Sequence, residues 1–291
     1  MRRVEGGNPR RKGQTCEPTA RRMLSHVSRL SQLCIALGSV EQMSPAGRKV
    51  ESGLLAWPVM RRRSPRLAEI PGMDSIMGPG GDRVANWATL AIAPVLSLAS
   101  RQTFLTRGLR TVQLMALVRQ NTRVGALGRD GSDHATIVVQ LLLTIAEHGG
   151  SKGVVQTRIG YALGLHGLFA YSVSGVSKLA SSSWRRGTAL SDSLRTVNYG
   201  HAQLFRFLES HSILRLIAAW TVIAAETLAA TVLFLPSRVR RAYFLAMLTL
   251  HLGIAYFMGL NRFFWAFLAF HPAIEFTAQG FTAARQRRRK R

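Results

Sequence analysis

Cysteine and acidic residues are both scarce in this 291-residue chain. Only two cysteines occur, Cys16 and Cys34. Two thiols at this spacing form neither a disulfide framework nor a cysteine-based zinc motif, which excludes a disulfide-stapled secreted domain and a zinc module. The chain has 14 Asp and Glu against 39 Lys and Arg, a net charge of +25. A balance this basic is typical either of nucleic-acid binding or of a membrane protein with basic flanks.

The distribution of charge along the chain separates these two classes. Basic residues gather in the first 80 residues and in the last seven, RQRRRKR, whereas residues 135–275 are mostly long apolar stretches joined by short polar turns. Such stretches suit the interior of a bilayer, and basic flanks suit its cytoplasmic surface. We therefore expect the partner of this chain to be the lipid bilayer and not a nucleic acid.

Six apolar segments are candidates for membrane spans. A spanning helix needs about 20 mostly apolar residues. The first segment is marginal because it contains Pro94, and the second is short. The six segments are 84–100, 134–148, 160–180, 213–236, 242–260 and 263–278. The sequence predicts an all-α fold, a multi-pass transmembrane helix bundle of about five to six spans, and residues 101–133 carry too many arginines to add another.

The bundle is expected to occupy residues 84–278, between a disordered basic N-terminal segment (1–83) and a basic cytoplasmic tail (279–291). Residues 1–83 mix Arg, Pro, Gly and Ser with little periodicity and contain no signal-peptide pattern, and an over-extended gene start would look the same. The positive-inside rule places the tail and the loop 238–241 on the cytoplasmic side of the cell membrane. The connection 181–210 then faces outside despite its four arginines. We expect it to be tied to the bundle.

Three ionisable residues within the apolar segments are candidate functional groups, because such groups are costly at membrane depth. Lys178 ends an apolar, small-residue run, Glu226 lies within the segment 213–236, and His251 lies within 242–260. Each also has a structural explanation. Lys178 can extend to the interface, Glu226 can be a protonated packing residue, and His251 can donate to a carbonyl of a neighbouring helix. Convergence of the three on one cavity would favour an enzyme.

The stretch YSVSGVSKLASSSWRRGTAL, residues 171–190, combines an aromatic residue, small residues, a glycine, a Lys-Leu pair and a Trp-x-x-Gly. It resembles a motif of the HTTM domain, the membrane domain of vitamin K-dependent γ-carboxylase. GRDGSDHATIVVQLLLT (128–144) and LTLHLGIAYFMGLNRFFWAFLAFHPAI (248–274) resemble further parts of that domain. The resemblance covers roughly residues 85–275.

The resemblance implies a carboxylase-like quinol oxidase and epoxidase of the lyase class. Its cofactor would be a reduced quinone, vitamin K hydroquinone or a menaquinol, bound by Trp184 and Glu226. Lys178 would be the base that deprotonates it, and His134 and His251 would be further catalytic groups. Oxygen would then add, and the alkoxide formed with the epoxide would remove a proton from a glutamate, to which carbon dioxide adds. In a dry site an uncharged lysine amine is populated near neutral pH, as a base requires.

The chain also departs from the carboxylase pattern. The carboxylase has a large extra-membrane domain after its bundle, which handles the protein substrate, and no such sequence follows residue 278 here. Peptide carboxylation is therefore not expected. Two functions stay open: a quinol-linked enzyme that uses Lys178, and a non-catalytic membrane protein of the same fold with a partner or self-protection role.

Overall fold

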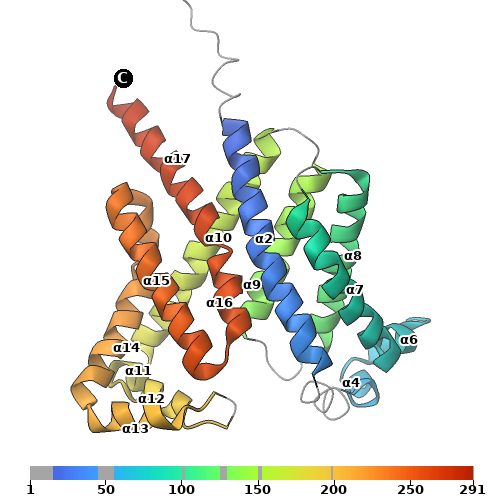
Figure 1. Cartoon of the computed structure of the whole chain (residues 1–291), viewed down its shortest axis with the longest axis horizontal. Coiled ribbons are helices and arrows are strands. Elements are labelled where there is room, and N and C mark those ends of the chain that lie inside the picture. Colours follow the sequence, from blue (N-terminus) through green and yellow to red (C-terminus); the bar gives the residue numbers. More distant parts are fainter. Residues whose placement is uncertain are drawn as a thin grey trace, which may run out of the picture.

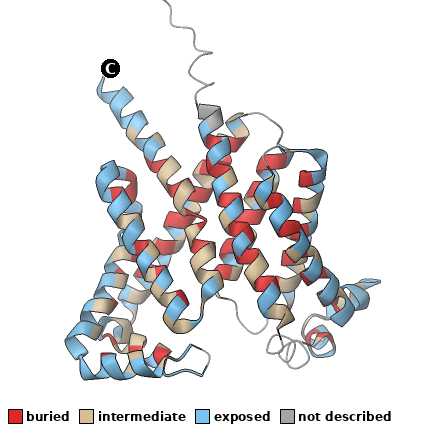
Figure 2. Cartoon of the chain, viewed as in Figure 1, coloured by how far each residue is buried: buried red, intermediate tan, exposed pale blue. Residues whose placement is uncertain are grey.

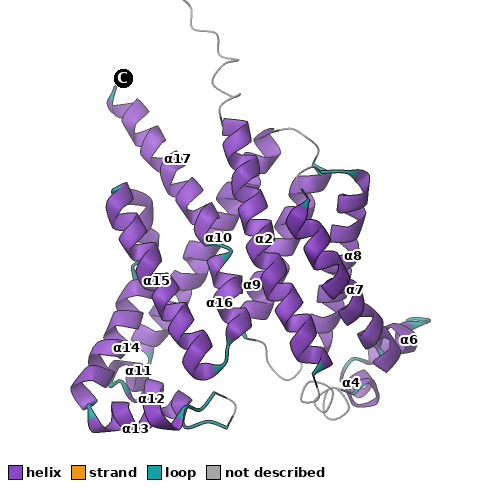
Figure 3. Cartoon of the chain, viewed as in Figure 1, coloured by secondary structure: helices purple, strands orange, loops and turns teal. Residues whose placement is uncertain are grey.

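Helices account for all the regular structure in the part of the chain that the structure describes. The computed structural model describes residues 16–44, 56–99, 102–124, 130–149, 153–197 and 199–290. No strand occurs in these ranges (Figure 3), which confirms the predicted all-α class. The long helices are α2 (Cys16–Met43), α7 (Pro79–Leu98), α8 (Phe104–Val124), α9 (Gly131–His148), α10 (Gly153–Ala180), α14 (Ser212–Thr227), α15 (Ser237–Met258) and α17 (His271–Arg289). The shorter ones are α4 (Trp57–Arg63), α5 (Pro65–Ala68), α6 (Met73–Met77), α11 (Ser182–Arg185), α12 (Thr188–Leu194), α13 (Ala202–Ser210), the 3-10 helix η1 (Ala229–Phe234) and α16 (Asn261–Leu268).

Helix α2 lies at the centre of the bundle, so the predicted disorder of residues 1–83 is wrong over this stretch. α2 packs against α7 and α9 on one side and against α10, α16 and α17 on the other (Figure 1). Its Ala20 and Val27 are fully buried. The prediction failed because the buried face of α2 contains polar as well as apolar residues. The hydropathy of the sequence therefore shows no clear helical period in this stretch. These buried polar residues are Ser28, Ser31, Gln32 and Ser39.

The rest of the predicted N-terminal segment is mostly helical where it is described. Helices α4, α5 and α6 form a small group with its own buried residues, Trp57, Met60 and Met77. The indole of Trp57 donates to Asp74 Oδ1 at 2.5 Å. Residues 1–15 and 45–55 lie outside the described ranges.

Two helices are long and apolar enough to cross a membrane, α10 and α15. A third candidate is the pair α13 and α14. The two helices are long and apolar enough to cross a membrane only when taken together, and they are bent by 108° relative to each other. By length and composition the described part of the chain thus has two or three candidate spans, against about five to six predicted. The segments 84–100 and 134–148 lie largely within α7 and α9, which are not among the helices long and apolar enough to cross a membrane.

Two predicted spans are interrupted. The segment 213–236 is not one helix, because α14 ends at Thr227 and the chain continues through Leu228 into η1. The amide of Leu228 bonds back to the carbonyls of Ala224 and Glu226, and Tyr243 donates to the carbonyl of Ala225 at 3.2 Å. These bonds satisfy carbonyl groups that the end of a helix leaves without partners.

The segment 263–278 is also divided, into α16 and the start of α17. Pro272 occupies the first turn of α17, where a proline is favourable because its missing N–H would have no helical partner there. Helix α17 then continues to Arg289, so most of the predicted basic tail 279–291 is helical.

The connection 181–210 is tied to the bundle, as the sequence predicted. It folds into α11, α12 and α13, which pack against α14. Arg185 donates to the carbonyls of Leu179 and Ala180 at the end of α10. Arg195 lies over the ring of Phe205, 5.7 Å from its centroid. Part of the positive charge of this connection is therefore used within the fold.

Beside its apolar core the bundle also buries polar side chains, and it exposes many apolar ones. On α8, Arg110 and Gln113 are buried, whereas Phe104 and Met115 are 92% and 68% exposed. Figure 2 shows buried residues along the facing sides of the long helices and exposed residues on their outer sides. A soluble protein rarely presents so many apolar residues to water, whereas hydrocarbon accepts them. Helix α8 thus packs within the bundle, although, as predicted from the arginine content of 101–133, it is not among the candidate membrane spans.

The importance of the buried polar groups can be tested at the paired side-chain amides of Gln32 and Gln113. Each side-chain amide donates to the carbonyl oxygen of the other, at 2.9 and 2.7 Å, and both residues are buried. Replacing one partner, Gln32→Ala, leaves a buried amide unpaired, which should cost about 1–3 kcal/mol of unfolding free energy. The measurement is thermal unfolding in detergent.

The exposed Gln286 serves as the matched control, and Gln286→Ala should leave the melting temperature unchanged. The double variant Gln32→Leu with Gln113→Leu should recover most of the lost stability, because it leaves no polar group unpaired. A Gln32→Ala protein as stable as the wild type would contradict this account of the core.

Candidate functional site at Lys178 and Glu226

Lys178 and Glu226, which are 48 residues apart in sequence, form an ion pair between α10 and α14. The Lys178 Nζ lies 2.6 Å from Glu226 Oε2 and donates a second hydrogen bond to Ser174 Oγ at 2.5 Å. The two side chains are 19% and 10% exposed, respectively. The pair therefore lies mostly out of solvent, where charges interact strongly and are expensive to leave unpaired.

The close approach of α10 to α14 depends on Gly175. A Cβ atom at this position would lie 2.6 Å from Thr227 Oγ1 and nearer still to the backbone amide of Thr227. Only a residue without a side chain allows the two helices to meet this closely, as small residues do between membrane helices. The small-residue run before Lys178 thus brings the amine to Glu226.

The helix ends next to the pair also favour a cation there. Lys178 is in the last turn of α10, and Glu226 is one residue before the end of α14. The C-terminus of a helix carries partial negative charge, which stabilises a nearby cation by roughly 0.3–1 kcal/mol. The positive charge of Lys178 is therefore held by its carboxylate partner and by the end of its own helix.

The ring of Trp184 lies beside the amine. The Nζ of Lys178 lies 5.2 Å from the centroid of the Trp184 ring. The backbone carbonyl of Arg185, the next residue, accepts a hydrogen bond from the Trp220 indole at 3.2 Å. This contact fixes α11 against α14. The tryptophan thus offers a flat aromatic surface beside the charged pair.

His251 lies in an aromatic cluster next to the pair. It is buried, and its Nδ1 lies 2.7 Å from the carbonyl oxygen of Met247 in the preceding turn of its own helix. Its ring stacks on Phe267 at 5.2 Å and meets Tyr171 edge-on at 5.7 Å. Tyr171 precedes Lys178 by two helical turns and therefore lies on the same side of α10. His251 is thus connected to the Lys178 side of α10 through its contact with Tyr171.

The structure does not bring His134 to this site. The ring of His134 lies 6.2 Å from that of His166, on the adjoining faces of α9 and α10. His166 precedes Lys178 by twelve residues, which corresponds to about 18 Å along a helix. Of the five predicted site residues, the structure thus groups Lys178, Glu226 and Trp184 directly, places His251 beside them and leaves His134 apart.

Sequence reasoning missed two residues of this region. Ser174 was noted only as a small residue, although its hydroxyl accepts a bond from the Lys178 amine. Tyr171 is fully buried, and its hydroxyl lies 3.3 Å from His271 Nε2. Their spacing of four and seven residues before Lys178, which places side chains on one helix face, could have found both.

The contact at Gly175 gives a test of the site geometry. Gly175→Val inserts a side chain between α10 and α14, which should cost about 1–3 kcal/mol by overpacking and separate Lys178 from Glu226. The melting temperature and the denaturant midpoint of unfolding should consequently fall.

Gly253→Val is the matched control, because a Cβ atom there meets nothing within 4 Å. It should change neither measurement by a comparable amount. Equal effects of the two substitutions would mean that the helices do not meet closely at Gly175.

Comparison with known proteins adds no assignment: no family model, no curated protein and no solved structure matches this chain.

Proposed function

We propose that this chain is a multi-pass protein of the cell membrane that binds a reduced quinone beside Lys178 and removes a proton from it. In this proposal α7 and α9 span the bilayer together with α10, α15 and the two interrupted segments, α14 with η1 and α16 with α17, and the C-terminus is cytoplasmic. Exposed apolar residues on α7 and α9, such as Val95 and Leu141, support the higher number of spans. The resemblance of residues 171–190 to the HTTM domain supports the substrate class.

The observation that carries the proposal is the Lys178–Glu226 pair at the edge of an apolar surface. Val176, two residues before the lysine, is 54% exposed, and Leu179 and Trp220 are exposed as well. A lipophilic molecule moving within the bilayer can therefore reach the partly exposed amine from the side. The residues fit a hydroquinone, because the Trp184 ring can stack on its ring while a hydroxyl meets the pair.

The chemistry of the pair is a proton relay. The proposal requires Lys178 to pass a proton to Glu226, its hydrogen-bond partner at 2.6 Å, which leaves a neutral amine and a neutral carboxylic acid. The amine then takes the proton of the substrate hydroxyl, and the ammonium formed stabilises the resulting phenolate oxygen by charge. Oxygen and carbon dioxide, which the resemblance implies as further substrates, would act after this transfer.

A second candidate is a non-catalytic role in which the pair only joins α10 to α14. The observation that favours it is the saturation of the amine, which already contacts Ser174, Glu226 and Trp184. Breaking a buried ion pair by removing one partner typically costs about 3–5 kcal/mol, whereas replacing both partners by apolar residues is often neutral. The two candidates therefore differ in what the double replacement does.

The test is quinol oxidation by the protein in lipid nanodiscs with menaquinol. Lys178→Met should lower turnover at least about 100-fold, the range expected on loss of a general base. The exposed Lys290 is the matched control, and Lys290→Met should keep full turnover.

The variant Lys178→Met with Glu226→Leu should keep the melting temperature of the wild type while remaining inactive. Wild-type protein without turnover, or a double variant with full turnover, would refute the proton-transfer role. The first of these results, combined with a normal melting temperature of the double variant, would support the non-catalytic candidate.

A further inference from the structure

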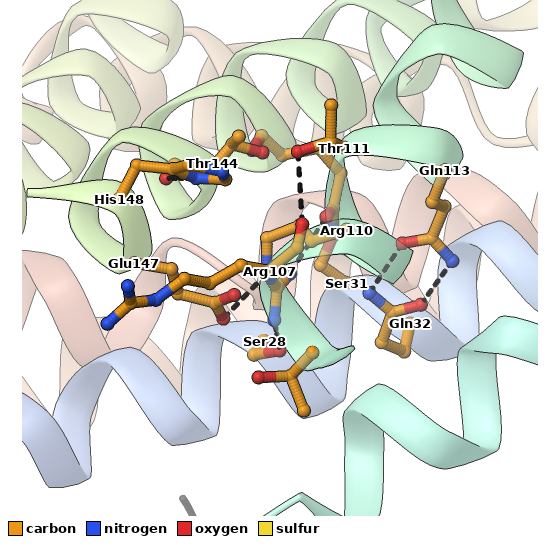
Figure 4. A network of polar contacts seen from close by, with 12 residues as sticks. Ser28, Ser31, Gln32, Arg107, Arg110, Thr111, Gln113, Thr144, Glu147 and His148 are labelled. Carbon is orange, nitrogen blue, oxygen red and sulfur yellow. Dashed lines mark hydrogen bonds and ion pairs between the residues drawn. The ribbon is translucent and has the colours of Figure 1, made fainter. Parts of the chain in front are cut away.

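A network of polar side chains joins α2, α8 and α9 at the end of the bundle away from Lys178 (Figure 4). Arg110 is at its centre and is buried. Its Nε donates to Glu147 Oε1 at 2.7 Å, its Nη1 to Gln140 Oε1 at 2.9 Å and its Nη2 to Ser28 Oγ at 2.9 Å. Gln140 in turn donates to Ser31 Oγ at 2.8 Å. The three nitrogens of Arg110 are thus engaged within the protein.

Two polar atoms beside this network have no hydrogen-bond partner in the described part of the chain. They are Glu147 Oε2 and Arg107 Nε, and both atoms are buried. The residue Glu147 is only 8% exposed. Leaving an atom of a buried charged group without a hydrogen bond costs more than about 1–3 kcal/mol of folding free energy. Such atoms are therefore rare in native structures and need an explanation. One atom calls for a donor and the other for an acceptor.

A cavity of about 340 Å³ opens at this place. Its volume lies in the lower part of the range for ligand pockets, roughly 300–1,000 Å³. Its polar lining consists mainly of Arg21, Ser28, Thr106, Arg107, Arg110 and Glu147. Because Arg110 is already paired with Glu147, Arg21 and Arg107 carry the charge available to a ligand. Guanidinium groups bind phosphate through several directed hydrogen bonds.

The surroundings of the cavity favour a lipid as the source of that phosphate. Leu98, four residues before the lining residue Gln102, is 80% exposed. Phe104 and Leu105, just before the lining residue Thr106, are exposed as well. These apolar side chains offer a surface for acyl chains directly beside the arginines. The basic free end of α17 lies at the same end of the bundle (Figure 1), as expected at the level of lipid headgroups.

We propose that this cavity binds an ethanolamine phosphate group, held by a phospholipid of the membrane. Arg21 and Arg107 bind the phosphate, and the ammonium group donates to Glu147 Oε2. A phosphate diester whose amine carries N–H donors satisfies both unpartnered atoms together. A choline headgroup has the same charges but no N–H to donate, so the site distinguishes the two headgroups.

The experiment measures lipid binding to the full-length protein in detergent by native mass spectrometry. Phosphatidylethanolamine should bind at least about fivefold more tightly than phosphatidylcholine with the same acyl chains. Arg107→Gln should weaken both lipids by about tenfold, since it removes a charge-assisted contact to phosphate. Glu147→Gln should abolish the preference for ethanolamine.

Arg158→Gln is the matched control, because Arg158 is exposed near the start of α10 and does not line the cavity. It should leave binding unchanged. Equal binding of the two lipids by the wild type, or equal effects of Arg107→Gln and Arg158→Gln, would overturn the proposal. The Arg107→Gln comparison keeps the test decisive if Glu147→Gln does not fold.

A further arm distinguishes the source of the headgroup. Soluble phosphoethanolamine, which has no acyl chains, should raise the melting temperature far less than the lipid at the same concentration. An equal effect would overturn the assignment to a membrane lipid and point to a soluble ligand with the same headgroup.

Discussion

The bundle depends on polar side chains that find their partners on other helices, in an interior surrounded by apolar outer faces. Arg110 bonds to α2 and α9 at once, and Gln32 pairs with Gln113 across α2 and α8. Such bonds specify position because each buried polar group has only a few geometries in which it is satisfied. They fix which helices are neighbours and at what height. Apolar contacts with lipid-like surroundings would not select one arrangement in this way.

The sequence predicted the helical class and the residues of the candidate site better than it predicted the boundaries of the bundle. Lys178 and Glu226 were recognisable because ionisable residues are rare in apolar segments, and the structure brings them to 2.6 Å. Helix α2 was missed because serines and a glutamine occupy its buried face. The buried position of Arg110 was also not predicted, because it lies in a stretch whose arginines argued only against a membrane span. A reading of hydropathy assumes that buried faces are purely apolar, whereas in this chain buried polar residues lie beside an apolar core.

Long-range geometry accounts for the remaining difference. Nothing in the sequence showed that His134 faces His166 and not Lys178, because the facing of α9 against α10 is set by packing with α2 and α8. The interruptions at Leu228 and before Pro272 depend similarly on contacts, such as that of Tyr243 with the carbonyl of Ala225. Helix α10 has 28 residues, which at 1.5 Å each is about 42 Å and close to the thickness of a bilayer with its headgroups. The ion pair lies at the C-terminal end of this helix, and the arginine cavity lies near the other end.

The backbone contact at Gly175 has a mechanical consequence. Side chains between two helices can change rotamer and absorb a small displacement, but here the backbone of one helix rests directly on the backbone of the other. At this level no side chain of α10 is available to absorb a displacement toward α14. The close approach therefore restricts how far the two helices can move together or slide at the point next to the ion pair.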